Sequence, residues 1–353
     1  MSRIARFCAA AAMAAVLAAP AFANDGFGGL SATGLQFDQT GVVQMLKEDL
    51  YISLEKIKVA YVFRHIGDED LTGEIIFPLP PISLAATFES EFAIPEDQMD
   101  KDNLVGFTAK VDGKPVKVKV DRIAVIEPDY DENRPQSASY DTPGKDITAT
   151  LKKYGIPTTL RWETASAALK KLPQKAKDDL AAQKIASFED GGDAYPMWSI
   201  IERYHWTQTF AAGKDVKIEH SYDGAFPGGI FIWKKKIEPG DYQAELVKKY
   251  CVDDGTGKAI YKALREQGEG ADKSAVGMAY YIDYVLTTAN TWAGPIGEFK
   301  LTLDKGNAKN VISLCIDGIK KTGPTTFVSE KKNFTPKDDL SILLVPDSST
   351  LPQ

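Results

Sequence analysis

The stretch Lys56–Pro81, KIKVAYVFRHIGDEDLTGEIIFPLPP, decides the fold class of this chain. In its first half, β-branched and aromatic residues occupy every second position, which is the pattern of a strand with one buried face. A polar turn at 67–70 precedes a second apolar run. Because proline removes a backbone donor, this second run is expected to end at an edge or a corner of a sheet. The residues of this structural corner are Phe77, Pro78 and Pro80.

Further strands are indicated on both sides of this stretch. The clearest hairpin joins 107–111 to 116–120 through Asp112-Gly113, a dipeptide that suits a tight turn. Alternation over 84–94 predicts another strand. Together these patterns predict a mainly β protein, α+β overall, built from antiparallel sheets.

The strand signals fall into two regions separated by a change of period. We expect two antiparallel β-sandwich-like domains, an N-terminal one over 24–126 and a C-terminal one with one or more helices over 195–353. A linker and a helical insertion over 127–194 lie between them. Within the insertion, apolar residues recur at helical spacing over 159–172, and Pro173 suits the first turn of a following helix.

Residues 1–23 have the parts of a secretory signal peptide. Arg3 and Arg6 precede an apolar run over 7–18, and small residues follow up to Ala23. This run is shorter than the ~20 apolar residues of a membrane span, so a retained anchor is the weaker alternative. We expect cleavage after Ala23, a periplasmic or secreted mature chain, and no transmembrane segment after cleavage.

The charge balance argues against polyanionic partners. The chain has 42 Lys and Arg against 49 Asp and Glu, a formal net charge of −7. After signal cleavage no long basic run remains. Nucleic acid is therefore not an expected partner, and binding to an acidic membrane surface is disfavoured.

Two of the three cysteines, Cys251 and Cys315, follow the expected cleavage site. In an oxidising compartment a lone pair usually forms a structural disulfide. It would close a loop of roughly 65 residues, worth about 4 kcal/mol in the loop-entropy model. A reactive or metal-binding thiol pair is the alternative, but no CxxC spacing supports it.

No sequence motif identifies an active site. The chain lacks a GxSxG elbow, a P-loop and a GxGxxG after a strand, so we assign no catalytic residue and no cofactor. His205 and His220 lie on adjacent predicted strands and, with Glu202 or Glu219, could bind zinc. Hydrogen-bonded or solvated sheet histidines are the favoured interpretation, because no HExxH-like spacing is present.

Three acidic clusters raise the question of calcium binding. None has the ligand spacing of an EF-hand loop, so solvated turns are the favoured interpretation. The clusters are Asp68-Glu69-Asp70, 129–132 and Asp253-Asp254.

Aromatic residues crowd the second β region, and Tyr204, Trp206 and Trp233 are the candidates for ligand binding. A sheet that exposes such rings can stack them on sugars or hydrophobic ligands. Packing in the core of a sandwich is the alternative that we favour.

Several short motifs spread over nearly all of the chain after residue 23 form a specific combination. They are Asn24-Asp25, Glu48-Asp49-Leu50 with Ile52-Ser53, Val59-Ala60-Tyr61-Val62-Phe63, Phe77-Pro78-Leu79-Pro80, Tyr204-His205-Trp206, Gly294-Pro295-Ile296 with Phe299, and Cys315. This combination resembles an uncharacterised family of secreted bacterial proteins, domain of unknown function 4424. The resemblance implies a periplasmic or secreted protein and supplies no activity.

A more distant resemblance concerns the N-terminal part. The strand with its Phe77-Pro78-Leu79-Pro80 corner and the hairpin at 111–114 resemble a vault/inter-α-trypsin-type β-sandwich. The chain departs from that pattern at Arg64-His65, where an asparagine turn is usual.

The combined prediction is a non-enzymatic binding or protein-interaction module of the cell envelope. Missing catalytic spacing, together with many sheet edges and aromatics, motivates it. Its partner would be an unknown envelope protein, glycan or lipid. The alternatives are a carboxylate-dependent, glycan-active envelope enzyme and a metal-binding protein that uses His205 and His220.

Overall fold

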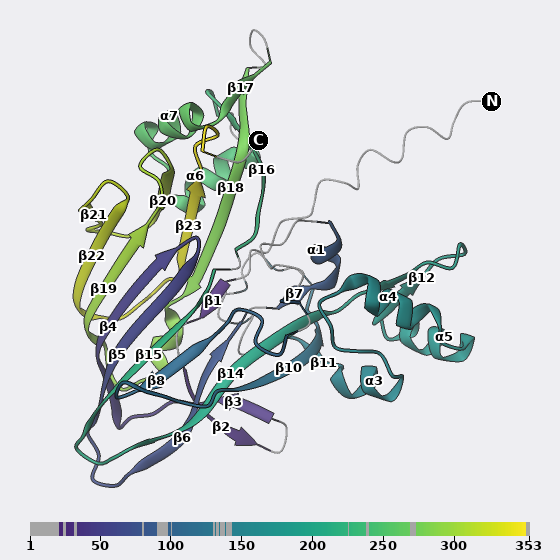
Figure 1. The fold of residues 1–353 in the computed structure, drawn as a ribbon, viewed down its shortest axis with the longest axis horizontal. Coiled ribbons are helices and arrows are strands. Elements are labelled where there is room, and N and C mark those ends of the chain that lie inside the picture. Colours follow the sequence, from purple (N-terminus) through teal and green to yellow (C-terminus); the bar gives the residue numbers. More distant parts are fainter. Residues whose placement is uncertain are drawn as a thin grey trace.

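An eight-stranded sheet brings together strands from early and late parts of the chain (Figure 1). The computed structural model describes residues 21–23, 26–31, 34–79, 81–89, 98–99, 101–129, 131, 134, 138, 143–224, 226–237, 240–268 and 273–350. In spatial order the sheet contains β21 (Lys320–Lys321), β22 (Thr326–Phe334), β19 (Ile296–Asp304), β4 (Val43–Ser53), β5 (Lys56–His65), β15 (Asp215–Asp223), β8 (Thr108–Val111) and β9 (Lys114–Pro115).

Strand β5 is the strand expected at the start of the opening stretch. The structure confirms the predicted buried face of this strand. Its residues are each at most 2% exposed, and they are Ile57, Val59, Tyr61 and Phe63. β5 pairs antiparallel with β4 on one side and with β15 on the other. A central position of this kind needs a strand with free backbone donors, and β5 contains no proline.

A seven-stranded sheet packs against one half of the eight-stranded sheet. Its strands are β11 (Lys145–Asp146), β10 (Lys119–Ile126), β14 (Ser199–Phe210), β6 (Leu71–Pro78), β2 (Gly26–Ser31) and β3 (Gly34–Phe37), with β7 (Ile82–Ser83) paired to β14. Aromatic rings fill the space between the two sheets. The ring of Phe77 on β6 lies 4.8 Å from that of Tyr222 on β15, and 4.9 Å from that of Phe107.

A six-stranded sheet lies over the other half. It contains β1 (Ala21–Ala23), β18 (Ser274–Val285), β23 (Leu340–Val345), β20 (Val311–Leu314), β16 (Gly228–Lys234) and β17 (Arg265–Gln267). Ile282 and Ile342 on one face join the core of the eight-stranded sheet. The opposite face is covered by α6 (Tyr242–Tyr250) and α7 (Asp254–Ala263), which form a separate hydrophobic core with it.

The remaining helices are short and peripheral. They are α1 (Leu84–Glu89), α3 (Thr148–Lys153), α4 (Trp162–Lys170), α5 (Gln174–Ala182) and the 3-10 helix η2 (Thr287–Thr291), with the small sheet β12 (Ala186–Phe188) and β13 (Ala194–Pro196) beside α4 and α5. We call residues 148–184, which hold α3, α4 and α5, the helical arm. It lies to one side of the sheets in Figure 1. Its buried positions Leu151, Leu169 and Leu180 hold it to the body through the large core.

The predicted mainly β class is confirmed, and helices occupy much of the predicted insertion. However, strands on both sides of that insertion share sheets: β5 pairs with β15, and β6 pairs with β14. The expected limits at 126 and 194 therefore do not separate one sheet from another. Among the described residues, no helix has both the length and the apolar character to cross a bilayer.

Two local predictions need correction. The turn at Asp112 and Gly113 is confirmed, with φ of 49° and 75°. Its second strand is only β9, and the chain then crosses to the other sheet as β10. The strand predicted over 84–94 begins as helix α1, and 90–94 lies outside the described residues. Buried Leu84 followed by alanines favours a helical turn, which Thr87 Oγ1 supports by donating to the Leu84 carbonyl over 2.7 Å.

Candidate functional site

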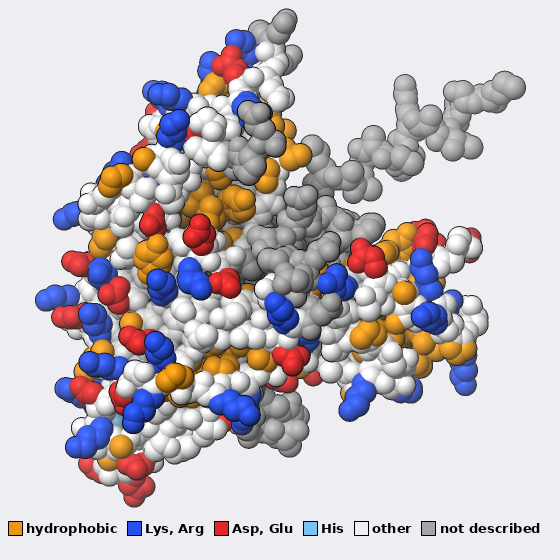
Figure 2. All heavy atoms as spheres, in the orientation of Figure 1, with side chains coloured by type: hydrophobic (Ala, Val, Ile, Leu, Met, Phe, Trp, Pro, Cys, Tyr) orange, Lys and Arg blue, Asp and Glu red, His pale blue; other side chains and the backbone are white. Residues whose placement is uncertain are grey.

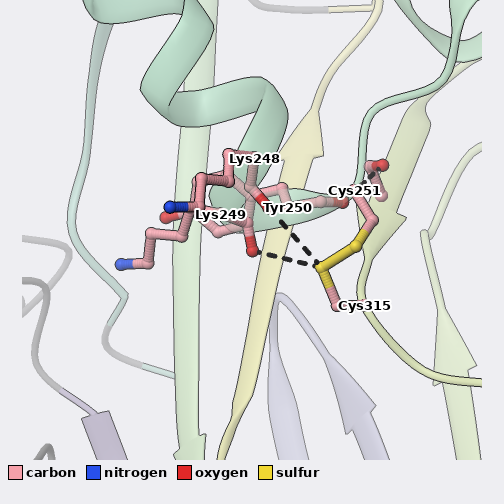
Figure 3. Close-up of a disulfide and its surroundings, with 6 residues drawn as sticks. Lys248, Lys249, Tyr250, Cys251 and Cys315 are labelled. Atoms are coloured by element: carbon pink, nitrogen blue, oxygen red, sulfur yellow. Dashed lines mark hydrogen bonds between the residues drawn. A yellow bond between two sulfur atoms is a disulfide. The ribbon is translucent and has the colours of Figure 1, made fainter.

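The two late cysteines form the predicted disulfide (Figure 3). Cys251 ends α6 with a left-handed φ of 50°, and Cys315 follows β20. Their Cα atoms are 5.1 Å apart across a sequence separation of 64. The bond therefore ties the helix that covers the six-stranded sheet to an outer strand of that sheet.

The three candidate ligand-binding aromatics are all in cores. Tyr204 is fully buried, Trp206 is 3% exposed and Trp233 is 2% exposed. The Tyr204 ring stacks on Phe107 at 4.9 Å, whereas Trp233 stacks on Phe231 at 5.6 Å beneath the helices. The structure therefore does not bring them together, and none presents a face to solvent on which a sugar could stack.

The two candidate metal ligands also lie apart. His220 on β15 faces the space between the sheets, where its ring lies 5.2 Å from that of Phe107. His205 follows core residue Tyr204 on β14, and successive strand residues point to opposite faces. His205 therefore points out of the sandwich. Within the described part of the chain, no group of three His, Cys, Asp or Glu side chains is placed to hold a metal.

His205 pairs instead with a carboxylate on the neighbouring strand. Its Nδ1 lies 2.7 Å from Glu74 Oε2, and Thr207 Oγ1 donates to Glu74 Oε1 over 2.5 Å. Glu74 and His205 are 4% and 7% exposed. Burial by itself would raise the pKa of Glu74, but the hydrogen bonds from His205 and Thr207 and the charges of His205 and Lys119 hold it below its ordinary value of 4.5.

The depressed pKa of Glu74 makes it a source of pH-dependent stability. A carboxylate with a lowered folded-state pKa stabilises the fold above its unfolded pKa, and this stabilisation is lost as pH falls through the folded value. We expect Glu74→Gln to lower the free energy of unfolding at neutral pH, with a difference from wild type that shrinks below the ordinary pKa of 4.5. Urea denaturation across the acidic range measures this difference.

Glu330→Gln is the matched control, because Glu330 is an exposed acid on β22. It should leave the acid limb of the stability curve unchanged. A Glu74→Gln difference that stays constant from neutral to strongly acidic pH would contradict the assignment.

Glu202, the proposed third ligand of a zinc site, is 1% exposed and serves a different purpose. Arg122 Nε donates to its Oε1 over 2.8 Å, and Tyr204 donates to its Oε2 over 2.6 Å. Burial and the nearby Glu202 charge raise the pKa of Tyr204. The backbone N–H of Leu104 lies 3.4 Å from Glu202 Oε2, and Arg122 also donates to the Lys101 carbonyl. Sequence reasoning missed this network because its members are far apart in the chain.

The predicted structural corner is the end of β6. Phe77 is fully buried, and the strand runs on to Pro78, which is opposite Arg203 of β14. The pairing with β2 on the other side stops at Ile76, so Pro78 has a described strand on one side alone. Pro80 lies outside the described residues.

Two of the acidic clusters serve as local hydrogen-bond acceptors. Asp253 caps α7 by accepting from the Thr256 N–H over 2.6 Å. Asp70 accepts from the Ala212 N–H over 2.9 Å, which joins two neighbouring turns. The cluster at 129–132 falls partly outside the described residues.

Two of the most exposed large apolar side chains among the described residues lie on strand β16. Ile230 is 80% exposed and Ile232 is 56% exposed, while Phe231 and Trp233 between and beside them are 2% exposed. In the part of the chain that the structure describes, β16 pairs with β18 alone. At the end of its other edge, the Gln243 side chain bonds to the backbone N–H and carbonyl of Lys234, and no described strand pairs with the edge before that residue. Figure 2 shows hydrophobic side chains gathered in a hollow over β18, beside β16. This open strand is the best candidate for a binding surface in the β body.

Two hollows lie on the helical insertion. One of about 600 Å³ lies between the end of α3 and α4 and is lined by residues such as Tyr154, Ala168 and Leu172. The other, about 510 Å³, lies between α5 and β12 and includes Phe188 and Met197. Sequence analysis gave no signal for either, because each is formed by side chains from different elements.

The chain was compared with known proteins. A family model described as domain of unknown function (DUF4424) matches residues 23–343. No curated protein matches the chain. A crystal structure of a protein from Legionella pneumophila subsp. pneumophila str. Philadelphia 1, provisionally described as nutrient binding, is similar at 13% identity and a TM-score of 0.44. The alignment covers 93% of this chain and 71% of that one, and a likeness this weak carries no functional argument.

The family match extends over most of the chain and includes every described strand from β4 to β22. The motifs at 77–80 and 204–206, which carried the resemblance in the sequence, lie within it. The chain therefore belongs to the family described as domain of unknown function (DUF4424).

Proposed function

We propose that this chain is an exported, non-enzymatic interaction module of the cell envelope that binds an extended segment of another protein along strand β16. The single observation that carries the proposal is an open strand edge with Ile230 and Ile232 80% and 56% exposed. An open edge offers a row of backbone donors and acceptors to an incoming strand, and alternate side chains then provide specificity.

Other edges of the sheets contrast with β16. The eight-stranded sheet ends in Lys114-Pro115 on one side and Lys320-Lys321 on the other, and the seven-stranded sheet ends in Lys145-Asp146. Lysine, proline and very short strands are the usual protection against unwanted pairing. Strand β16 has seven residues, and its first six include neither a charge nor a proline. The edge strands β3 and β20 also lack charge and proline, but each has only four residues. Among these described edges β16 is the longest without such protection, which suits it to pairing.

Burial of the two isoleucines supplies a driving force. Covering a β-branched aliphatic side chain is worth roughly 1.5–3 kcal/mol. Partly exposed Val276, Met278 and Tyr280 of β18 alternate along the strand next to them. An incoming strand with apolar side chains on that face would extend an existing apolar surface.

Export is part of the proposal. It is supported by the signal-like residues 1–23 and by the disulfide, since disulfides persist in oxidising compartments. The start of the family match at residue 23 agrees with a mature chain that begins near there.

Photo-crosslinking in the cell tests the proposal directly. A photoreactive amino acid at Ile230 or Ile232 is expected to give one discrete protein adduct in the periplasmic fraction. The adducted chain is expected to begin at Asn24, which tests export in the same sample. Peptide mapping of the adduct should place the link in an extended segment of the partner.

The matched control is the same photoreactive residue at Ile66, which is 49% exposed in a turn after β5. It should give no adduct of that mass. The backbone N–H and carbonyl of Lys234 bond to the Gln243 side chain instead of to β18. Ile230 and Ile232 have the same parity along the strand, so both direct their N–H outward. A proline at Ile230 should therefore abolish the adduct formed at Ile232 while the circular dichroism spectrum is retained. Equal labelling from Ile66 and from β16, or no adduct from β16, would contradict the proposal.

A further inference from the structure

The helical arm is strongly basic in an acidic protein. Residues 148–184 contain eight Lys and Arg and three Asp and Glu, whereas the whole chain has a formal net charge of −7. The charge of the arm is therefore opposite in sign to that of the rest of the molecule. The net charge of the whole chain does not reveal that positive charge is concentrated in the arm.

Most of the arm's lysines have no acidic partner. Within the described residues, Lys170 pairs with Asp193 at 2.8 Å, but no ion pair forms at the other lysines of the arm. On the body, some lysines form ion pairs, as in Lys56–Asp223 and Lys273–Glu266. The lysines of the arm without an ion pair are Lys152, Lys153, Lys171, Lys175, Lys177 and Lys184.

Helix energetics explain only part of this cluster. Lys152, Lys153 and Lys171 lie at the C-terminal ends of α3 and α4, where the helix dipole favours cations. Lys175 and Lys177 lie at the start of α5, where the dipole disfavours them and where no acid stands in the first turn. Lysines are therefore present even at a helix end where the helix dipole disfavours positive charge.

Apolar side chains lie among these charges. Lys171 lines the first hollow together with Leu172, and Lys177 and Lys184 line the second with Phe188 and Met197. Met197 is 54% exposed. Figure 2 shows hydrophobic side chains between Lys and Arg side chains on the arm.

We propose that the helical arm docks on an anionic phospholipid surface. The positive charges are spread over three helices instead of converging on one hollow, which suits a plane of negative headgroups better than a single acidic side chain. They are almost all lysines, whose flexible point charges suit phosphate headgroups without fixed geometry. Apolar side chains in shallow hollows between them can enter the boundary between headgroups and acyl chains. The acidic body would be repelled, so the arm faces the membrane.

This inference is independent of the strand proposed for protein binding, because β16 lies on a different sheet and carries none of these lysines. It also revises the expectation, drawn from the net charge and the absence of a long basic run, that binding to an acidic membrane surface is disfavoured. Salt screens the interaction between exposed charges that lie farther apart than a Debye length, about 10 Å at 0.1 M salt. A surface therefore responds to the lysines clustered near it more than to the net charge of the whole chain.

Vesicle co-sedimentation of the purified mature chain tests the proposal. Vesicles of phosphatidylcholine with about a quarter phosphatidylglycerol are expected to retain the protein, whereas phosphatidylcholine alone is not. Each lysine near an anionic surface is worth about fivefold in affinity. The triple variant Lys152→Glu, Lys171→Glu, Lys184→Glu should therefore bind more than about 100-fold more weakly.

The control triple variant Lys320→Glu, Lys321→Glu, Lys332→Glu makes the same change of charge on exposed positions of β21 and β22. It should retain most of the binding. Met197→Ser changes no charge and should weaken binding several-fold. If the glutamate variants lose their native circular dichroism, the corresponding Lys→Gln variants replace them.

Three outcomes would overturn the proposal. One is equal affinity for vesicles with and without phosphatidylglycerol. Another is equal loss of binding in the arm variant and the control variant. The third is binding to soluble polyglutamate without binding to phosphatidylglycerol vesicles, which would assign the arm to an acidic protein.

Discussion

Replacement of Arg122 by methionine is expected to lower the free energy of unfolding by about 3–5 kcal/mol, the usual result of removing one partner of a buried ion pair. The Arg122 side chain is 17% exposed, and that of its partner Glu202 is 1% exposed. Methionine preserves most of the apolar volume but leaves a carboxylate inside the protein without its cation. Urea denaturation of the wild type and the variant measures the loss.

Arg122→Met should also increase local opening of the segment before β8, in addition to lowering the stability of the whole fold. Arg122 donates to the carbonyl of Lys101 over 2.7 Å, and Glu202 accepts from the N–H of Leu104 at 3.4 Å. The network therefore fastens the segment before β8 to the strands β10 and β14. Hydrogen exchange should show faster opening of 101–105 in the variant than of β4 or β5.

Two controls isolate the charge. Arg64→Met breaks an ion pair with Asp215 whose side chains are 50% and 43% exposed, and it should destabilise the fold far less than Arg122→Met. The double variant Arg122→Met, Glu202→Gln removes the buried charge while leaving an acceptor for Tyr204. It should recover part of the loss. A cost below about 1 kcal/mol for Arg122→Met would show that the ion pair does not stabilise the fold.

The strands were predictable from the sequence where their signals are local. The alternation of Ile57, Val59, Tyr61 and Phe63 was sufficient to predict both the strand and its buried face. The tight turn at Asp112 and Gly113 was predictable because few dipeptides tolerate two successive positive φ angles.

The arrangement of strands into sheets was not predictable in the same way. Strand β4 pairs in parallel with β19, far along the chain, and no local pattern specifies that partner. The predicted adjacency of the strands of His205 and His220 failed for the same reason. The connection after Phe210 carries the chain from the seven-stranded sheet to the eight-stranded one, so the two strands face each other across the core instead of pairing.

The three aromatic residues considered as ligand-binding candidates are buried in hydrophobic cores. Tyr204, Trp206 and Trp233 are attractive in a sequence because aromatic rings dominate both binding sites and cores. The sequence cannot distinguish these roles, because alternation predicts which residues share a face of a strand but not whether another element covers that face. The exposure of Ile230 and Ile232 could not be predicted for the same reason, because they alternate with buried Phe231 and Trp233 on the same strand.

Replacement of both cysteines by serine is expected to lower the free energy of unfolding by about 4 kcal/mol, since the bond closes a long loop in the unfolded chain. The bond joins Cys251 to Cys315 over a sequence separation of 64. In the loop-entropy model, this stabilisation comes from restricting the unfolded chain. The double variant should therefore keep the native circular dichroism spectrum and unfold at lower urea concentration.

Reduction provides the internal control. A thiol reductant should destabilise the wild type to the level of the double variant and should not change the variant itself. In the folded protein, loss of the disulfide is expected to affect α6 first, because Cys251 lies at the C-terminal end of this helix. The buried α6 residues Leu246 and Tyr250 cover the six-stranded sheet.

Hydrogen exchange separates the two origins of this stabilisation. If the bond acts through the unfolded chain, exchange that requires global unfolding accelerates everywhere, including β5 and β14, while local opening of α6 keeps its wild-type rate. If the bond instead holds α6 against the sheet, α6 opens faster in the variant and the distant strands are unaffected. Unchanged stability after both cysteines are replaced would contradict either origin, because the bond would then stabilise neither the helix nor the fold.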